Sequence, residues 1–105
     1  MVITVDLAAG AGTVGLDDPA DCKKFHLAAT GAPDEAALGS ALAVSGVGRM
    51  HDGHALIDIA ALRRLAAGRV PEGWEADFEG MLGYARTKGW VQADAVQAHV
   101  EWSEA

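Results

Sequence analysis

The clearest hydrophobic pattern lies between residues 71 and 90, where large apolar side chains recur at helical spacing. On a wheel of 3.6 residues per turn, one arc of about 100° holds Trp74, Phe78, Met81, Leu82 and Ala85. Such an arc is typical of a helix with one buried face. The pattern therefore predicts a helix over residues 72–88, and we expect this helix to organise the hydrophobic core.

Charged residues and a glycine give this helix its direction and its end. Pro71 suits a first turn, acidic residues crowd the positive end of the helix dipole, and Arg86 and Lys88 lie at its negative end. Gly89 can adopt the left-handed conformation that ends many helices. We expect the next residue, Trp90, to pack back against the last turn.

Alternation of apolar and polar residues predicts strands in three other parts of the chain. β-Branched residues alternate with others over residues 2–7, and a return strand through residues 13–16 would complete a hairpin. Residues 23–30 fit a strand better than a helix. The same alternation over residues 91–102 predicts a last strand with one buried side.

Turn and capping residues predict a hairpin and two short helices in the middle of the chain. Asp52-Gly53 stands between two strand-like runs, and this dipeptide is typical of a type I′ hairpin turn. A helix follows Pro33 and ends at Gly46. Asp58 is placed to cap a second short helix over residues 59–67.

These elements predict an α+β fold over residues 1–105, which we interpret as a single domain. We expect a small, mainly antiparallel sheet that packs against one long helix and two shorter ones. No internal repeat or low-complexity linker divides the sequence.

Composition and charge narrow the classes of partner. The formal net charge is −7, which disfavours nucleic acid and anionic lipid as partners. The single cysteine cannot form an intramolecular disulfide, and the first residues lack the pattern of a signal peptide or a membrane span. We therefore expect a cytoplasmic protein with no membrane contact.

Gly10, Gly12 and Gly15 have the G-x-G-x-x-G spacing that brings backbone N–H groups to a dinucleotide pyrophosphate. In that motif the glycines open a helix, whereas here an acidic run interrupted by Pro19 follows them. We interpret the glycines as a connection between strands, and we expect no cofactor.

The histidines are the candidate metal ligands or acid-base groups. His51 and His54 would face each other across the Asp52-Gly53 turn, and His26 or His99 would arrive from other strands. Two ligands do not make a metal site, and an exposed cross-strand pair is the simpler interpretation. A histidine-lined pocket for a small molecule is the corresponding functional alternative, because imidazole titrates near neutral pH.

Cys22 precedes Lys23 and Lys24, and adjacent cations can lower the pKa of a thiol and make it reactive. A structural thiol without special reactivity is the alternative interpretation. No arrangement of the cysteine-hydrolase type follows from spacing alone.

The last half of the sequence predicts a hairpin, a short helix, the long helix and then a strand pair. This order is similar to the winged-helix arrangement, in which the second of the two helices enters the DNA major groove. The resemblance covers about half of the chain, contains no diagnostic motif, and implies DNA binding. The corresponding helix here begins with Glu72, Glu75, Asp77 and Glu79, which disfavours that use.

The outer side of the long helix carries Gly80 and Gly83 beside Tyr84. Glycines inside a helix reduce its stability, so either another backbone approaches closely there or the helix is loosely constrained, and we take this surface as a candidate interaction site. The three tryptophans suit the core better than a pocket or an interface.

Two functional hypotheses follow. The first is a non-enzymatic accessory or protein-interaction module, with a protein partner or self-association as a homodimer. The second is a small-molecule-binding or metal-binding protein, or an enzyme, that uses a histidine-lined pocket.

Overall fold

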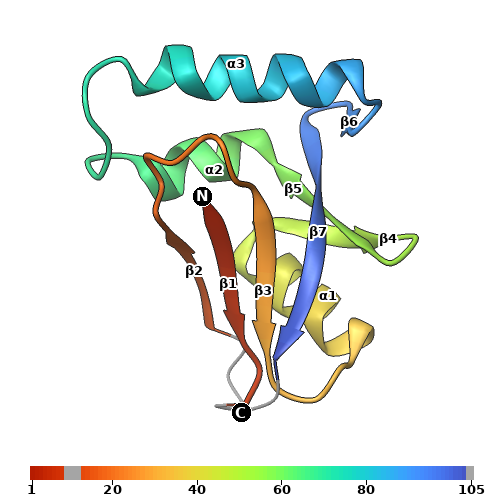
Figure 1. Ribbon diagram of the computed structural model, residues 1–105. Coiled ribbons are helices and arrows are strands. Elements are labelled where there is room, and N and C mark those ends of the chain that lie inside the picture. The colour runs from red at the N-terminus through yellow and green to blue at the C-terminus, as the bar shows by residue number, and fades with distance from the viewer. Residues whose placement is uncertain (9–12, 104–105) are drawn as a thin grey trace.

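The computed structural model describes residues 1–8 and 13–103, which form seven strands and three helices (Figure 1). In chain order the elements are β1 (Val2–Asp6), β2 (Thr13–Asp17), β3 (His26–Thr30), α1 (Glu35–Ser45), β4 (Gly48–His51), β5 (His54–Asp58), α2 (Ile59–Ala66), α3 (Trp74–Thr87), β6 (Val91–Gln92) and β7 (Ala95–Ser103). The prediction of an α+β fold with one long and two shorter helices is confirmed.

All seven strands belong to one curled sheet with the order β2-β1-β3-β7-β5-β4, in which β6 pairs with the beginning of β7. Four pairs are antiparallel, namely β1 with β2, β4 with β5, β5 with β7, and β6 with β7. The central pairs, β1 with β3 and β3 with β7, are parallel. The mainly antiparallel character was predicted, whereas the parallel centre was not, because no local turn motif marks a crossover connection.

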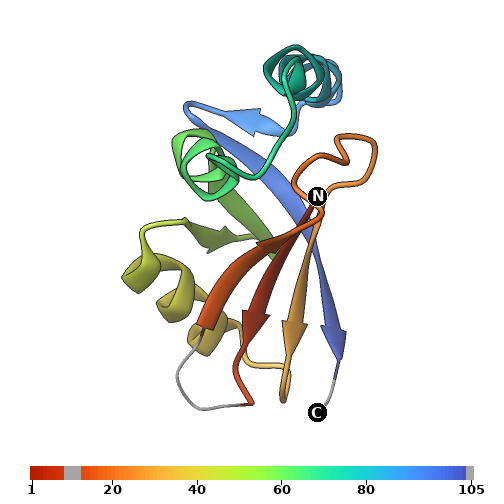
Figure 2. The ribbon, with the colours of Figure 1, turned by 90° about the vertical axis from the view of Figure 1, so that its left-hand side faces the viewer.

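Helices α1 and α2 cover one side of the sheet, as Figure 2 shows. Helix α1 contacts both β4 and β2, which are the two edge strands, and α2 contacts β2 and β5. Because the sheet curls, a helix can reach both edges and cover them, which limits pairing with other chains. The buried core includes Leu38 and Leu42 of α1, Leu62 of α2, Ile3 and Val5 of β1, Leu27 of β3, Ile57 of β5 and Val96 of β7.

Helix α3 lies across one end of the sheet, above α2 in Figure 1. Four of the five residues predicted for its buried face are buried, and Met81 is half-buried. Those four residues belong to the same cluster as the α1 and α2 side chains. The helix therefore closes one end of the core, and the sheet with α1 and α2 builds the rest of it.

The two ends of α3 differ in how well the sequence predicted them. Gly73, with φ of 87°, stands immediately before the helix, so Pro71 precedes the first turn instead of lying in it. At the other end Gly89 has φ of 77°, and the N–H of Trp90 donates to the carbonyl of Ala85 at 2.9 Å. This left-handed cap is the one predicted.

The other local predictions also have clear outcomes. Asp52 and Gly53 both have positive φ, as a type I′ turn requires, and His51 pairs with His54 across it. Asp58 directly precedes α2, but its side chain makes no capping hydrogen bond, so that detail of the prediction was wrong.

Two motif interpretations can be compared with the fold. The winged-helix-like order of elements is present in the C-terminal half, but β7 lies between β3 and β5 at the centre of the sheet. Gly10 and Gly12 lie outside the described residues, and Gly15 lies within strand β2. A strand therefore follows the glycine-rich segment where a dinucleotide site would need a helix.

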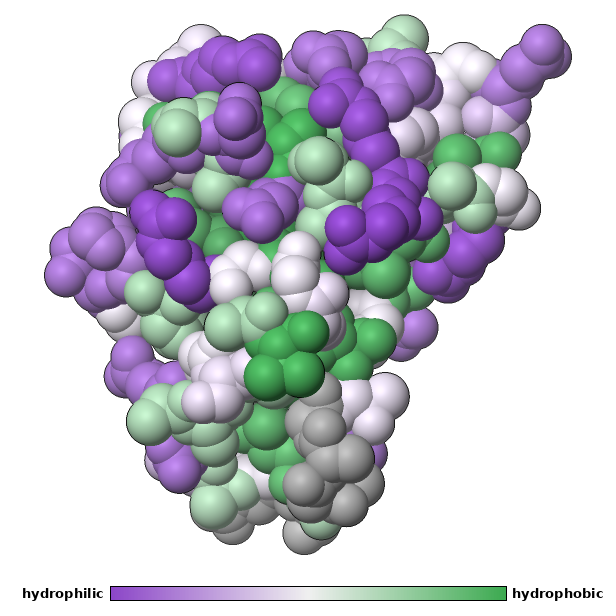
Figure 3. Space-filling model, turned by 180° about the vertical axis from the view of Figure 1, so that it is seen from behind, coloured by the Kyte–Doolittle hydropathy of each residue, from purple (hydrophilic) through white to green (hydrophobic). Residues whose placement is uncertain are grey.

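The face that carries α1 and α2 mixes hydrophobic patches with hydrophilic side chains (Figure 3). Val44, on the outer side of α1, is 90% exposed. Among the described residues, none of the helices combines the length and the apolar character that crossing a membrane requires.

Candidate binding groove

A groove of about 700 Å³ lies between the C-terminal half of α3, the loop that precedes β3, and strands β5 and β7. This volume is within the range of small-molecule sites, which is roughly 300 to 1,000 Å³. Four separate segments of the chain meet there, since its lining runs from Cys22 in the loop to His99 in β7. The groove is the candidate functional site.

Apolar and aromatic side chains make up one part of the lining, with Phe25 from the loop, Met81, Tyr84 and Ala85 from α3, Trp90 from the cap, and Val96 from β7. The rings of Tyr84 and Trp90 meet edge to face, with centroids 5.9 Å apart. Tyr84 is 58% exposed and Trp90 is 40% exposed, so these two rings form an accessible rim. The expectation that the tryptophans belong to the core was therefore wrong for Trp90.

The local cause of this exposure is the helix cap. Trp90 is the residue that follows Gly89, and the cap directs it back toward the last turn of α3. Its ring consequently meets Tyr84 on the outside of the helix instead of entering the core. The Nζ atom of Lys88 lies 5.5 Å from the centroid of the Tyr84 ring, which extends the rim with a cation.

Strand pairing supplies the polar part of the lining. His54 begins β5 and His99 lies in β7. Ala55 of β5 pairs with Ala98 of β7, and His54 precedes Ala55 whereas His99 follows Ala98. Residues that face each other in an antiparallel pair lie about 5 Å apart. Both imidazoles line the groove, as do the Lys23 ammonium group and the Gln97 amide.

The other two histidines are engaged outside the groove. The Nε2 atom of His26 lies 3.4 Å from a carboxylate oxygen of Glu101, and that of His51 lies 3.3 Å from Asp52. Within the described part of the chain, no group of three or more His, Cys, Asp or Glu residues is arranged to hold a metal ion. His51 and His54 thus form a cross-strand pair, and only His54 of the two reaches the groove.

Cys22 is one of the residues that line the groove. Burial raises its pKa, and the negative charge of Asp77 in α3 raises it further. Of the two interpretations of Cys22, a raised pKa favours the structural thiol without special reactivity. A raised pKa reduces the thiolate fraction at neutral pH and makes the thiol a poor nucleophile.

The candidate surface on the outer side of α3 is only partly in the groove. Gly80 and Tyr84 line it, whereas Gly83 does not. A Cβ atom added to either glycine would meet no described atom within 4 Å beyond its own helix and chain neighbours. Within the described residues, the close backbone approach expected at these glycines is therefore not observed.

The N-terminal half of α3 is fixed to the rest of the protein and so positions the groove wall. The Trp74 ring stacks on the Phe78 ring, with the two centroids 4.7 Å apart. The Trp74 Nε1–H donates to the carbonyl oxygen of Pro19 at 2.6 Å. This hydrogen bond joins α3 to the loop that carries Cys22, Lys23 and Phe25 on the other side of the groove.

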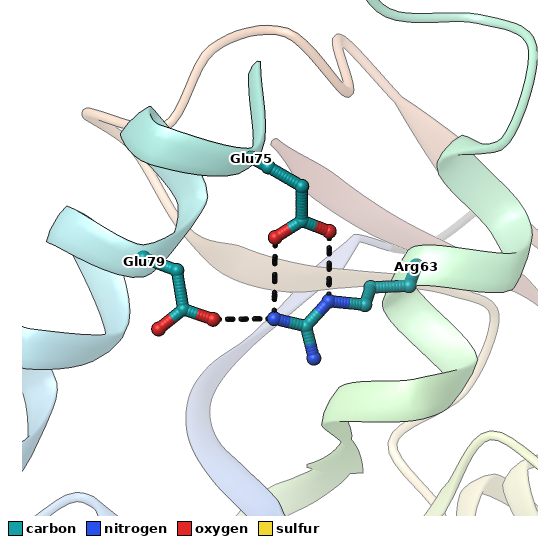
Figure 4. A network of polar contacts seen from close by, with 3 residues as sticks. All are labelled: Arg63, Glu75 and Glu79. Carbon is teal, nitrogen blue, oxygen red and sulfur yellow. Dashed lines mark hydrogen bonds and ion pairs between the residues drawn. The ribbon is translucent and has the colours of Figure 1, made fainter. Parts of the chain in front are cut away.

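A polar network adds a second attachment, between α3 and α2 (Figure 4). The Arg63 guanidinium donates to both carboxylate oxygens of Glu75 and to Glu79, and its Cζ atom lies 5.1 Å from the centroid of the Phe78 ring. The hydrogen bond to Glu75 raises the pKa of Arg63 above its ordinary value. Glu75 and Glu79 lie 12 and 16 residues after Arg63, and no local sequence pattern indicates that the three side chains meet.

Comparison of the chain with protein-family models, with curated protein sequences and with solved structures found no match. The geometry of the groove is therefore the basis for a functional interpretation.

Proposed function

We propose that the protein is a non-enzymatic binding protein and that the groove beside α3 holds a small organic ligand. The observation that supports this proposal is the combination of volume and lining. About 700 Å³ of space is lined by apolar and aromatic residues together with a few polar groups. Binding sites for small molecules commonly have this composition, because apolar area supplies affinity and a few polar groups set orientation.

The state of Cys22 supports a binding role over a catalytic one. Its thiol has a raised pKa, and within the described contacts no hydrogen bond joins it to His54 or His99. Nucleophilic catalysis needs a base within hydrogen-bond reach of the nucleophile. The groove residues are better suited to holding a molecule than to attacking it.

Two variants of α3 test the proposal. Gly80→Trp places a large ring in the groove, whereas Gly83→Trp, three residues further along the same helix, places it outside the lining. We expect the dye 8-anilinonaphthalene-1-sulfonate to bind the parent and Gly83→Trp, and to bind Gly80→Trp at least about tenfold more weakly. Fluorescence titration measures this, and equal binding by all three proteins would contradict the proposal.

A bound molecule would also be visible directly. Native mass spectrometry of protein purified without chelator, beside a denatured spectrum, would detect a mass above that of the chain that is lost on denaturation. The groove predicts such a mass for the parent and its absence from Gly80→Trp.

A protein partner or a second copy of the chain is the second candidate, and the exposure of Tyr84 and Trp90 favours it. Aromatic residues of this kind are frequent among the energetic centres of protein interfaces. Sedimentation analysis across a range of concentrations tests self-association. If the protein self-associates through this rim, Tyr84→Ala should shift it toward the monomer, whereas Val44→Ala on α1 should not.

A further inference from the structure

The charge of the groove is opposite to that of the chain as a whole. The sequence contains 15 Asp and Glu residues against 8 Lys and Arg residues, which gives the net charge of −7. Among the described residues that line the groove, none is Asp or Glu, and the ionisable lining groups are Lys23, two histidines, Cys22 and Tyr84. A carboxylate does act on the groove wall, since Asp77 raises the pKa of Cys22, but Asp77 is not part of the lining.

The four histidines also differ according to whether they line the groove. His26 and His51, which lie outside the groove, are each within 3.4 Å of a carboxylate oxygen. His54 and His99, which line it, have no ion-pair partner among the described residues. Neutral imidazole offers one N–H donor and protonated imidazole offers two, so both histidines can donate to an acceptor in the groove.

The remaining lining suits a flat apolar body. Phe25, Tyr84 and Trp90 present three aromatic rings, and Met81 contributes a flexible thioether side chain that adapts to an aromatic surface. Two of the three rings come from a different segment than the polar groups, whereas Phe25 lies in the same loop as Lys23. Lys23, His54 and His99 belong to the loop and the strands, whereas Tyr84 and Trp90 belong to α3 and its cap.

Resting on the proposed groove function, we infer that the ligand is an aromatic carboxylate. Its carboxylate accepts hydrogen bonds from the Lys23 ammonium group and from the imidazoles of His54 and His99, and its ring lies against the aromatic side of the groove. Charge-assisted hydrogen bonds to a carboxylate are about twice as strong as neutral ones, which favours the anion over an uncharged analogue. The positive charge of Lys23 disfavours a cationic analogue inside the groove, whereas the net charge of −7 acts in the opposite direction and is screened by salt.

Three probes of the same shape test the inference, namely 2-naphthoate, 2-naphthamide and 2-(aminomethyl)naphthalene. Isothermal titration calorimetry near neutral pH measures the affinity of each. We expect 2-naphthoate to bind about tenfold more tightly than the amide, and the amine to bind most weakly.

Neighbouring lysines provide a matched pair of variants. Lys23 lines the groove and Lys24 does not. Lys23→Gln should weaken 2-naphthoate binding about tenfold and leave 2-naphthamide binding unchanged, whereas Lys24→Gln should change neither. His99→Gln should also weaken 2-naphthoate binding selectively, and circular dichroism of each variant checks that the fold is intact.

The possible outcomes separate this inference from the proposed function. Similar affinities for all three probes, or equal effects of Lys23→Gln and Lys24→Gln, would overturn the assignment to carboxylates while leaving a groove that binds aromatic molecules. If none of the three probes binds, both the ligand class and the proposed function are overturned.

Discussion

The two halves of α3 show how one helix can serve two purposes. Its N-terminal half is held by the burial of Trp74 and Phe78 in the core, by the hydrogen bond from Trp74 to Pro19, and by the Arg63 network. Its C-terminal half still buries Leu82 and Ala85, but its other side carries Gly80 and the exposed Tyr84 at the groove.

This difference indicates that one half of α3 fixes the position of the helix and that the other half is available to bind a ligand. Side chains that are buried and hydrogen-bonded define one position for the helix, and the part of the groove wall that belongs to α3 is positioned with it. The N-terminal half should therefore control the stability of the protein, and the C-terminal half should control binding. The following substitutions test this division, in order of decreasing effect.

Phe78→Ala should cause the largest loss. The side chain is fully buried in the core, and truncating a buried phenylalanine typically costs about 3 to 5 kcal/mol. Tyr84→Ala, six residues further along the helix, should cost less than about 1 kcal/mol because Tyr84 is largely exposed. Urea unfolding followed by circular dichroism measures both, and a Phe78→Ala variant as stable as the parent would show that the buried face is wrongly assigned.

Trp74→Phe tests the hydrogen bond that attaches the N-terminal half of α3 to Pro19. The substitution keeps an aromatic ring against Phe78 but leaves the Pro19 carbonyl without its indole donor. A buried acceptor that loses its donor costs about 1 to 3 kcal/mol. Trp90→Phe is the control, since the Trp90 indole makes no hydrogen bond among the described residues and its ring is 40% exposed. Its free energy of unfolding should stay within about 1 kcal/mol of the parent.

Arg63→Gln removes the charged network between α2 and α3. The Arg63 side chain is 39% exposed, so solvent screens its ion pairs, and we expect a loss of about 1 kcal/mol. Arg64→Gln removes a neighbouring arginine that is absent from the network and should have little effect. The difference between the two variants should shrink as salt is added, because screening weakens exposed ion pairs.

Gly83→Ala should have the opposite sign and stabilise the protein by about 0.5 to 1 kcal/mol. Alanine favours the helical conformation more than glycine, and the added methyl group would meet open space. The melting temperature measures the gain. A lower melting temperature would mean that an atom outside the described contacts lies against this side of α3.

The Cys22 thiol reports on the loop side of the groove. Because its pKa is raised, the thiolate fraction is small below that pKa and grows only as the pH rises through it. Iodoacetamide should therefore react more slowly with Cys22 than with a cysteine in a short peptide at pH 7.5. Asp77→Asn removes a charge that raises this pKa and should speed the reaction, whereas Glu72→Gln should not.

Features that depend on residues close together in the sequence were predicted, whereas features that depend on residues far apart in the sequence were not. The Asp52-Gly53 turn and the cap at Gly89 were predicted correctly because each depends on residues within one turn of the chain. The parallel pairing of β3 with both β1 and β7 was not predicted, since these strands are far apart in sequence and no turn residue specifies which strands become neighbours.

The candidate site was predicted only in fragments. The sequence singled out Gly80 and Tyr84 on one element and His54 on another, with His99 as an additional histidine, but it gave no reason to join them. Phe25, Met81 and Gln97 were not recognised as site residues, because in sequence they are ordinary members of amphipathic elements. Trp90 was assigned to the core because large apolar residues are usually buried, although the predicted cap correctly directed it back toward the last turn of the helix.

By itself, the sequence determined which segments become helices, strands and turns, and which side of α3 is buried. The spacing of hydrophobic residues, the left-handed conformation of glycine and the capping residues each act over a few positions. They can therefore be read directly from a short stretch of sequence. Only the tertiary structure decided that β7 lies between β3 and β5, that α3 closes one end of the sheet, and that Lys23, His54 and His99 share a groove whose described lining residues include no Asp or Glu. The physical reason is that these placements depend on how the whole chain buries its apolar surface and satisfies its backbone, which no short segment specifies.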